Sequence, residues 1–305
     1  MPGIFSCGGI FRLYCAGSYL AWHELDIFFF LGVFGDLLVP LWLIALSYLA
    51  VLLFKFFREV QKRRLLEQEL EIAASIQRSF LPANIERIGA IRIRASLEPA
   101  KFVGGDFYDI IRFGDSSVGV LIGDVCGKGV SASLIMAQTI SLFRVIARDL
   151  RQPDLALSAL NTQLSSILVD RFVTAQYLLI REKEGSWEGA CAGHVPLLYF
   201  QKQSGSLSEL VPASGPPLGL SESARYQTHF SHFAPGDAIF MYTDGWIEAR
   251  NRRNQELGIK KLKEFFQWSA HKDLDAILSD FKLQHQAFCA RAELFDDLTA
   301  VVLKF

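Results

Sequence analysis

The sequence predicts an α+β protein in which a globular domain follows a long apolar segment. The expected strands come in runs and the expected helices in two blocks, whereas a doubly wound fold would alternate them strictly. The chain has 305 residues, of which 51% are hydrophobic. Its mean hydropathy of +0.25 is high for a soluble protein, which points to an uneven distribution of apolar residues. A sizeable core is therefore expected, and wholesale disorder is excluded.

The charge pattern argues against a nucleic-acid-binding protein. The chain carries 31 Lys and Arg against 32 Asp and Glu, a formal net charge of −1, and neither part of the chain has a basic surplus. Binding to a phosphate backbone needs such a surplus. The five cysteines form no CxxC pair and no Cys/His ligand spacing, which excludes a zinc ribbon and a disulfide scaffold.

The apolar residues are concentrated near the N-terminus. Residues 37–54 read LLVPLWLIALSYLAVLLF without a charge, and the apolar stretch 27–34 precedes them. About 20 apolar residues are enough for a helix to cross a bilayer. A buried core helix is the alternative, but such helices rarely run this long without a polar face. We expect residues 27–56 to form a transmembrane segment and residues 1–26 to be extracytoplasmic.

The flanking charges predict the orientation of this segment. Five basic residues follow the uncharged run 37–54, namely Lys55, Arg58, Lys62, Arg63 and Arg64. Because basic residues gather on the cytoplasmic side of a membrane, we expect the C-terminal part of the chain to be cytoplasmic. Residues 4–22 are moderately apolar, so a second membrane-associated segment there is left open.

Residues 57–82 are expected to form a linker helix between the membrane and the globular domain at 83–305. Apolar side chains recur with helical and partly heptad spacing, and no Gly or Pro interrupts the pattern before Pro82. The stripe consists of Leu66, Leu70, Ala73, Ile76 and Phe80. Two interpretations remain open: a signalling helix that forms a homodimer through residues 60–80, and a passive stalk.

The globular domain begins with an alternating pattern at 91–97, which is typical of a half-buried strand. Further strands are expected at 118–122, 172–181, 186–192, 197–201, 238–243 and 298–304. Helices are expected at 130–150, 154–169, 258–268 and 273–290. Because several of these strands follow one another without a helix between them, the pattern favours antiparallel sheets.

Aspartates recur at the ends of these strands. They are Asp106, Asp124, Asp244 and the pair Asp296–Asp297, and three of these positions lie beside glycine. One Asp-Gly after a strand is ordinarily a turn. Several carboxylates at strand ends without His or Cys instead favour Mg²⁺ or Mn²⁺. A metal-activated water would then be the nucleophile. The segment GDVCGKG lacks the GxxxxGK[ST] spacing of a nucleotide-binding loop.

Eight motifs occur in order along the chain: IQRSFLP (76–82), LEPAKFVGGDFYD (97–109), IGDVCGKGVSASLIMA (122–137), FVTAQY (172–177), AGHVPLL (192–198), PPLGL (216–220), FMYTDGWIEARN (240–251) and DDLTAVVL (296–303). Together they resemble the SpoIIE/RsbU branch of the metal-dependent (PPM, protein phosphatase 2C-like) serine/threonine phosphatases. The resemblance covers about 72–305.

This resemblance implies a two-sheet antiparallel β-sandwich flanked by helices, with two Mn²⁺ or Mg²⁺ ions at one edge. Asp106 would bridge both ions, and Asp124 with the backbone carbonyl of Val125 would bind the first. Asp244 and Asp296 would bind the second ion, with Asp297 as the alternative to Asp296. Asp106, Asp124 and Asp244 are thus the expected catalytic residues.

The same resemblance gives roles to neighbouring residues. Gly105 and Gly245 would keep the backbone close to the ions, and Asp109 would orient a water. His194 is expected to fix a loop, with a general acid as the alternative. Lys128 would either touch the phosphate or lie in solvent. Helix 130–150 would be a switch helix that carries the loop of Asp124.

The function that this resemblance implies is a protein phosphatase. The apolar segment and its flanking charges predict that the enzyme is anchored in the bacterial inner membrane, with its catalytic domain in the cytoplasm. The implied substrate is a phosphorylated anti-sigma-factor antagonist (STAS-type) protein. One alternative is a GGDEF-like nucleotide cyclase, although Phe107 stands where that motif has Glu and the later aspartates would be unexplained. The other is an inert pseudophosphatase that only binds partners, against which the intact aspartates argue.

Overall fold

The computed structural model describes residues 8–82, 87–290 and 294–305, with side chains of the first helix described from residue 39 onward. Two compact units make up the chain, Met1–Gln68 and Glu69–Phe305. The sequence-based assignment of residues 1–7 to an extracytoplasmic segment lies outside the described residues.

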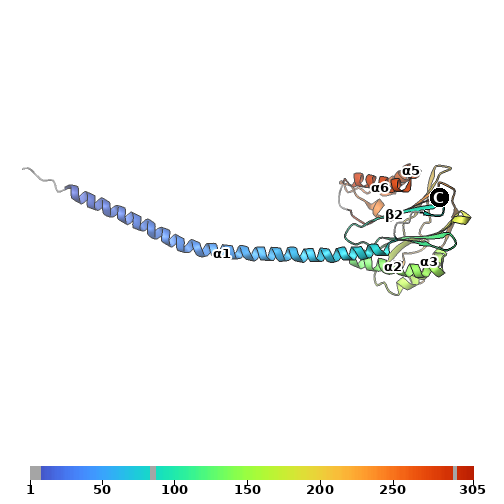
Figure 1. Ribbon diagram of the computed structural model, residues 1–305, viewed down its shortest axis with the longest axis horizontal. Coiled ribbons are helices and arrows are strands. Elements are labelled where there is room, and N and C mark those ends of the chain that lie inside the picture. Colours follow the sequence, from blue (N-terminus) through green and yellow to red (C-terminus); the bar gives the residue numbers. More distant parts are fainter. Residues whose placement is uncertain (1–7, 83–86, 291–293) are drawn as a thin grey trace, which may run out of the picture. The chain divides into compact units, whose positions relative to one another are not determined.

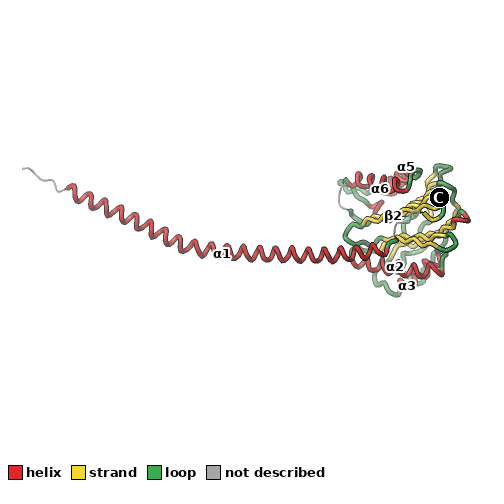
Figure 2. Tube along the Cα trace, viewed as in Figure 1, coloured by secondary structure: helices red, strands yellow, loops and turns green. Residues whose placement is uncertain are grey.

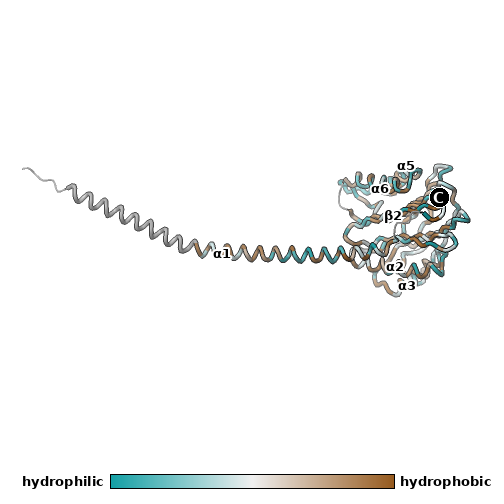
Figure 3. The backbone as a smooth tube through the Cα atoms, in the orientation of Figure 1, coloured by the Kyte–Doolittle hydropathy of each residue, from teal (hydrophilic) through white to brown (hydrophobic). Residues whose placement is uncertain are grey.

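The first unit belongs to helix α1, which runs without interruption from Gly8 to Phe80 (Figure 1). Pro40 lies inside this helix, and no break occurs between residues 56 and 57, where the sequence placed a domain boundary. The stretch Val39–Phe80 contains an 18-residue window with a hydropathy of 2.0 and no buried residue, so it is long and apolar enough to cross a membrane. Figure 3 shows the apolar part of α1 in brown.

The second unit contains two antiparallel sheets. The first sheet has the order β1 (Arg87–Ile88), β2 (Ile91–Glu98), β11 (Leu298–Lys304), β10 (Ala238–Tyr242), β7 (Leu197–Gln201) and β8 (Ser206–Leu210). The second sheet has the order β3 (Phe107–Arg112), β4 (Ser117–Val125), β5 (Val173–Arg181), β6 (Ser186–Ala192) and β9 (His229–His232). The predicted α+β class and antiparallel pairing are thus confirmed.

Helices cover the two sheets on their outer faces (Figures 1 and 2). Helices α2 (Val130–Asp149) and α3 (Pro153–Ser165) pack on the second sheet. Helices α4 (Gly245–Glu248), α5 (Gly258–Ser269) and α6 (Leu274–Cys289) pack on the first. Helix α2 also has the length and composition of a membrane span, but its buried face belongs to the core of this unit.

Three layers of apolar side chains hold this unit together. Trp187, Ile122 and Val301 belong to the layer between the two sheets. Phe143 and Tyr177 pack edge to face beneath α2, with ring centroids 4.9 Å apart. Aromatic rings such as Phe240 and Phe281, stacked at 4.4 Å, fill the space below α5 and α6. The strand-end aspartates therefore emerge from strands whose side chains are packed in these layers.

Candidate functional site

Asp106 lies at the junction of the two sheets, directly before β3. Its Oδ2 accepts hydrogen bonds from the hydroxyls of Thr243 at 2.7 Å and Thr299 at 2.6 Å, which come from the ends of β10 and β11. Only 2% of Asp106 is exposed. Burial, followed by the nearby charge of Asp124, raises the pKa of Asp106 well above its usual value. Asp106 is thus oriented by the first sheet although it belongs to the second.

Asp124 and Val125 are the last two residues of β4 and lie opposite Asp106. The register pairs Asp124 with Thr174 of β5. A methyl group on Gly105 would lie 2.7 Å from the carbonyl oxygen of Val125 and 3.1 Å from Oδ1 of Asp124, so only glycine permits this close approach. Burial, and then the charges of Asp244, Asp296 and Asp297, raise the pKa of Asp124 to about 7. The predicted ligands of the first ion are therefore neighbours.

Asp244 and Asp296 form the far side of the same rim. Asp244 immediately precedes α4, and its pKa is raised by burial and then by the charge of Asp296. Gly245 lies against the backbone carbonyl of Asp297, where a side chain would collide. The structure thus brings these two predicted ligands of the second ion into electrostatic range of each other and of Asp124.

Asp297 makes a different set of contacts from Asp296. Its Oδ1 accepts the amide N–H of Ala100 at 2.7 Å, and its Oδ2 accepts the amides of Gly105 at 2.8 Å and Asp106 at 3.4 Å. Its side chain is buried and holds the loop that carries Asp106. The geometry therefore favours Asp296 over Asp297 as the residue that faces the rim.

Lys128 contacts the rim directly. Its Nζ lies 2.9 Å from Oδ2 of Asp296, donates to the carbonyl of Phe295 at 2.7 Å and lies 4.7 Å from the centroid of the Phe295 ring. The Lys128 side chain is 41% exposed, so it lies at the surface of the loop and contacts Asp296 at the same time. Both roles that the sequence left open for Lys128, contact with the phosphate and a loop position in solvent, stay predictions.

His194 is buried beneath the rim and links the two sheets. Its Nε2 lies 3.0 Å from the carbonyl of Tyr242 in β10, and its Nδ1 lies 2.8 Å from the hydroxyl of Thr174 in β5. Burial lowers its pKa to about 4. A neutral imidazole that donates to Tyr242 and accepts from Thr174 has no N–H left for a substrate. These contacts support the predicted loop-fixing role.

Asp109 lies away from the rim, inside the domain. Both of its oxygens accept from the guanidinium of Arg144 in α2, Oδ2 from Nε at 2.8 Å and Oδ1 from Nη2 at 2.8 Å. The expected role of orienting a water therefore needs correction. Asp109 is the buried partner of a two-pronged ion pair that joins β3 to α2, because the guanidinium fork matches the carboxylate.

Several residues of this site were not found from the sequence. Thr243 and Thr299 orient Asp106, and both stand within the motifs TDG and DDLT, so their position beside the aspartates was the available signal. Gln77 and Arg144 gave no such signal, since each contacts a residue far along the chain. Gly104, the partner of Gln77, lies in the loop before β3, and Asp109, the partner of Arg144, lies in β3 itself, a strand that the sequence did not predict.

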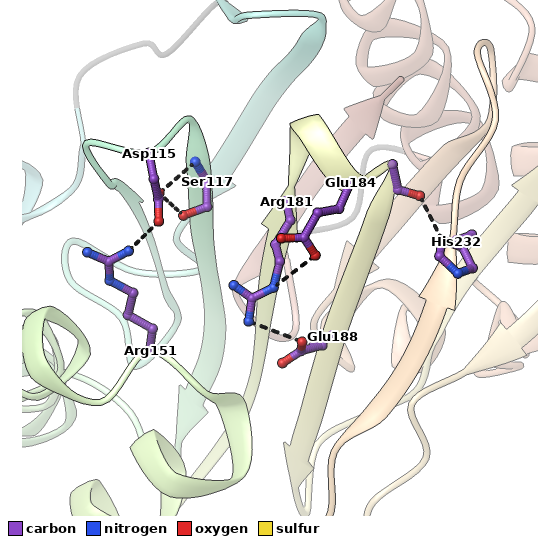
Figure 4. A network of polar contacts seen from close by, with 8 residues as sticks. Asp115, Ser117, Arg151, Arg181, Glu184, Glu188 and His232 are labelled. Carbon is purple, nitrogen blue, oxygen red and sulfur yellow. Dashed lines mark hydrogen bonds and ion pairs between the residues drawn. The ribbon is translucent and has the colours of Figure 1, made fainter.

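A second polar network lies at the opposite end of β4 and β5 from Asp124 (Figure 4). Arg151 binds Asp115 at 2.6 Å, and Arg181 binds Glu188 at 3.1 Å. Hydrogen bonds from Ser117, then the charge of Arg151, lower the pKa of Asp115 to about 2. Every charge drawn there has a partner of opposite sign or a backbone contact, so this network braces a turn.

The donor set at the rim fits hard divalent cations. Carboxylates and one backbone carbonyl are the ligands that Mg²⁺ and Mn²⁺ prefer. Within the described residues, no group of three or more His, Cys, Asp or Glu side chains lies close enough to hold an ion as placed. Burial, and then repulsion between the carboxylates, raises the pKa values of Asp106, Asp124 and Asp244. A cation would relieve this repulsion.

Comparisons with known proteins agree with this architecture. The family model described as Stage II sporulation protein E (SpoIIE) matches residues 114–305. The chain is 28% identical over 242 residues to the phosphoserine phosphatase RsbU of Bacillus subtilis (strain 168), which covers 78% of this chain and 70% of RsbU.

Solved structures share the same fold. The SiaA-PP2C domain of Pseudomonas aeruginosa superimposes with a TM-score of 0.71 at 20% identity, over 80% of this chain and 98% of that domain. RsbX in complex with magnesium superimposes with a TM-score of 0.51 at 16% identity, over 70% of this chain and 92% of RsbX. At these identities the likeness shows the PP2C fold alone.

Proposed function

Since the chain belongs to the SpoIIE family of PP2C-fold serine/threonine phosphatases, we propose that it is a membrane-anchored enzyme that hydrolyses phosphoserine or phosphothreonine on a protein. The observation that supports this most directly is the shared rim of Asp106, Asp124, Asp244 and Asp296, where burial and then the charges of neighbouring carboxylates raise the pKa values of Asp106, Asp124 and Asp244. A site of this kind attracts cations and a phosphate bound to them.

The proposed cofactors are two Mn²⁺ or Mg²⁺ ions. Asp106 would contact both, Asp124 and the carbonyl of Val125 would hold one, and Asp244 with Asp296 would hold the other. Bound ions of this type lower the pKa of a water enough to make it a nucleophile at neutral pH. The chain's own part is to hold the carboxylates in place, and the hydroxyls of Thr243 and Thr299 do this for Asp106.

Lys128 and Asp297 support the site from its edges. Lys128 partly offsets the negative charge of Asp296, and its own charge opposes the rise in the pKa of Asp244. Asp297 holds three backbone amides of the loop before β3, which limits the movement of Asp106. Preorganised charges of this kind contribute most to a reaction when they need not rearrange.

The proposed substrate is a phosphorylated anti-sigma-factor antagonist of the STAS type. The support is the similarity to RsbU, whose name specifies phosphoserine, together with the ordered motifs of the SpoIIE/RsbU branch. Asp124, Asp244 and Asp296 are partly exposed, so they are within reach of a phosphorylated side chain on a folded protein.

The proposed location is the bacterial inner membrane, crossed once by α1, with the catalytic domain in the cytoplasm. The apolar window of α1 and the basic residues that follow it, from Lys55 to Arg64, support this arrangement. A homodimer through residues 60–80 is proposed as well, since Ile72 and Ile76 are 62% and 56% exposed on that helix.

The alternatives differ in what they predict. A GGDEF-like cyclase is disfavoured, because the segment GGDFYD here leads into β3 of a PP2C-like sandwich. An inert pseudophosphatase would share the fold and lack turnover. The test is hydrolysis of p-nitrophenyl phosphate and of a phosphoserine protein by the full chain in detergent, with and without Mn²⁺. Turnover that needs Mn²⁺ supports the proposal, whereas binding of the phosphoprotein without turnover contradicts it.

A further inference from the structure

The last turns of α1 contact the loop that carries Asp106. The side-chain amide of Gln77 donates from Nε2 to the carbonyl of Gly104 at 2.9 Å, and its Oε1 accepts the N–H of Gly104 at 3.2 Å. Gln77 is 8% exposed and lies 27 residues before Gly104. One side chain therefore satisfies both backbone groups of a residue only two positions before Asp106.

This loop is held from a second side by Asp297. The carboxylate of Asp297 accepts the amides of Gly105 and Asp106, the residues that follow Gly104. Gly104 is packed so closely against Asp297 that a side chain would collide with the carboxylate. The segment before β3 is thus clamped between the amide of Gln77 and the carboxylate of Asp297.

The end of α1 is tied to β3 at another point. Arg144 of α2 donates from Nη2 to the carbonyl of Phe80 at 2.6 Å, and the same guanidinium holds Asp109 of β3. Gly104 is joined to the last turn of α1 directly, by Gln77, and Asp109 is joined to the same turn through Arg144. Asp106 lies between these two residues in the sequence. A shift of this turn would therefore act on both ends of the segment that carries Asp106.

We infer that Gln77 is a positioning residue, which sets the place of Asp106 and thereby the affinity of the site for divalent cations. This inference rests on the proposed function, because it concerns the same site. Loss of a buried hydrogen-bonding partner destabilises the local arrangement by about 1–3 kcal/mol. If that energy holds the loop in its binding position, its loss weakens cation binding by about 5-fold to 150-fold, since about 1.4 kcal/mol corresponds to tenfold.

The experiment compares Gln77→Met with the wild-type full chain in detergent. Methionine keeps the length and volume of the side chain but can neither donate to nor strongly accept from Gly104. The matched control is Gln68→Met, the same substitution at an exposed position of the same helix. The Kd of Mn²⁺ is measured by titration calorimetry, well below the melting temperature of each variant.

Hydrogen exchange gives a readout that does not depend on activity. We expect the amide of Gly104 to lose protection in Gln77→Met, while the amide of Gly105 retains protection from Asp297. Gln77→Glu keeps an acceptor for the Gly104 amide and loses the donor to the Gly104 carbonyl. It replaces Gln77→Met in the experiment if the methionine variant is unfolded. It is expected to preserve protection of Gly104 and to weaken Mn²⁺ binding.

The outcomes separate this inference from the proposed function. An Mn²⁺ Kd raised about tenfold in Gln77→Met and unchanged in Gln68→Met would support it. A Kd equal to that of the wild type, with Gly104 still protected, would overturn the inference alone. If the wild-type chain itself bound no Mn²⁺, the proposed function would fall and the inference with it.

Discussion

His194 donates a hydrogen bond from Nε2 to the backbone carbonyl of Tyr242, 3.0 Å away, and thereby ties the second sheet to β10, which ends two residues before Asp244. The other nitrogen of the ring meets the hydroxyl of Thr174, the register partner of Asp124. One neutral imidazole thus stands behind aspartates from both sheets. Its protonation state should govern how firmly the two sheets hold together.

Stability should fall between pH 6.5 and pH 4 because of His194. Burial lowers its pKa to about 4 in the folded state, whereas an unfolded histidine has a pKa of about 6.5. The unfolded chain therefore binds the extra proton first, and unfolding becomes easier as the pH falls through this window. From pH 7 to pH 5, His194 should account for about 2 kcal/mol of lost unfolding free energy.

The measurement is chemical unfolding of residues 69–305 at both pH values, for the wild type and for His194→Gln. Glutamine retains a donor for Tyr242 but does not titrate. Between pH 7 and pH 5, His194→Gln should therefore lose about 2 kcal/mol less unfolding free energy than the wild type. An equal loss in both proteins would show that His194 is not the group responsible.

Asp124→Asn should stabilise the cation-free domain and abolish its Mn²⁺-dependent hydrolysis. Burial and the neighbouring carboxylates raise the pKa of Asp124 to about 7, so its charge opposes folding increasingly as the pH rises from about 4 through 7. Asparagine removes this cost and should raise the unfolding free energy at pH 8 by about 1 kcal/mol or more. Turnover should fall by several orders of magnitude, since a ligand of the proposed ions is gone.

Asp106→Asn and Asp244→Asn should lose turnover in the same way. Thermal melting without Mn²⁺, and hydrolysis with it, are the two measurements for each variant. A stable variant with unchanged turnover at two of the three positions would refute the assignment of the rim as the catalytic site.

Asp296→Asn and Asp297→Asn should fail in different ways. Asp296 faces Lys128 and the rim, so its replacement should weaken Mn²⁺ binding about tenfold or more and leave stability nearly unchanged. Asp297 accepts three backbone amides, so its replacement should cost about 1–3 kcal/mol of stability. Calorimetric titration and unfolding measure the two effects, and identical profiles would contradict the distinct roles.

The topology of the chain is tested by a reporter fused after Phe305. If α1 crosses the inner membrane with its basic flank inside, a reporter that works only in the cytoplasm should be active there. The same reporter on a chain with Lys55, Arg58, Lys62, Arg63 and Arg64 changed to glutamine should lose its fixed orientation. Activity of a reporter specific to the periplasm in the unaltered chain would reverse the topology.

The sequence predicted the elements whose pattern is local. Strand β2 alternates along its length, and β6, β7 and β11 have the predicted bounds, because periodicity and flanking turns are sufficient to define them. Strand β3 was not predicted because Asp109 interrupts its apolar residues, so the segment shows neither a regular alternation nor an unbroken apolar run. Helix α4 was missed because four residues are too few for a helical period.

The site shows the same division between local and distant information. The aspartates were found because each follows or precedes an apolar strand, and Val125 through the family motif. The ion pair of Asp109 with Arg144, 35 residues away, depends on how α2 packs against β3. No short sequence pattern predicts this packing. The distinction between Asp296 and Asp297 likewise needed the position of the loop at Ala100.

The last prediction concerns the helix before the domain. In residues 69–80 the buried positions are Ala74 and Gln77, with Phe80 packed against the core, whereas Ile72 and Ile76 are exposed. The residues of the predicted apolar stripe therefore have different surroundings. Phe80 packs on the domain, whereas Ile76 faces outward. A fragment 81–305 lacks Gln77 and Phe80, so it should be less stable and nearly inactive, whether or not the chain dimerises.

Dimerisation is tested separately with Ile76→Glu in the fragment 60–305. Because Ile76 is 56% exposed, glutamate there should leave the monomer folded, but a charge within an apolar interface between two copies would be costly. Sedimentation should show a dimer for the unaltered fragment and a monomer for Ile76→Glu, with lower phosphatase activity at matched Mn²⁺. The control is Arg78→Glu, an exposed charge reversal in the same turn. A monomeric unaltered fragment whose activity equals that of Ile76→Glu would establish the passive stalk instead.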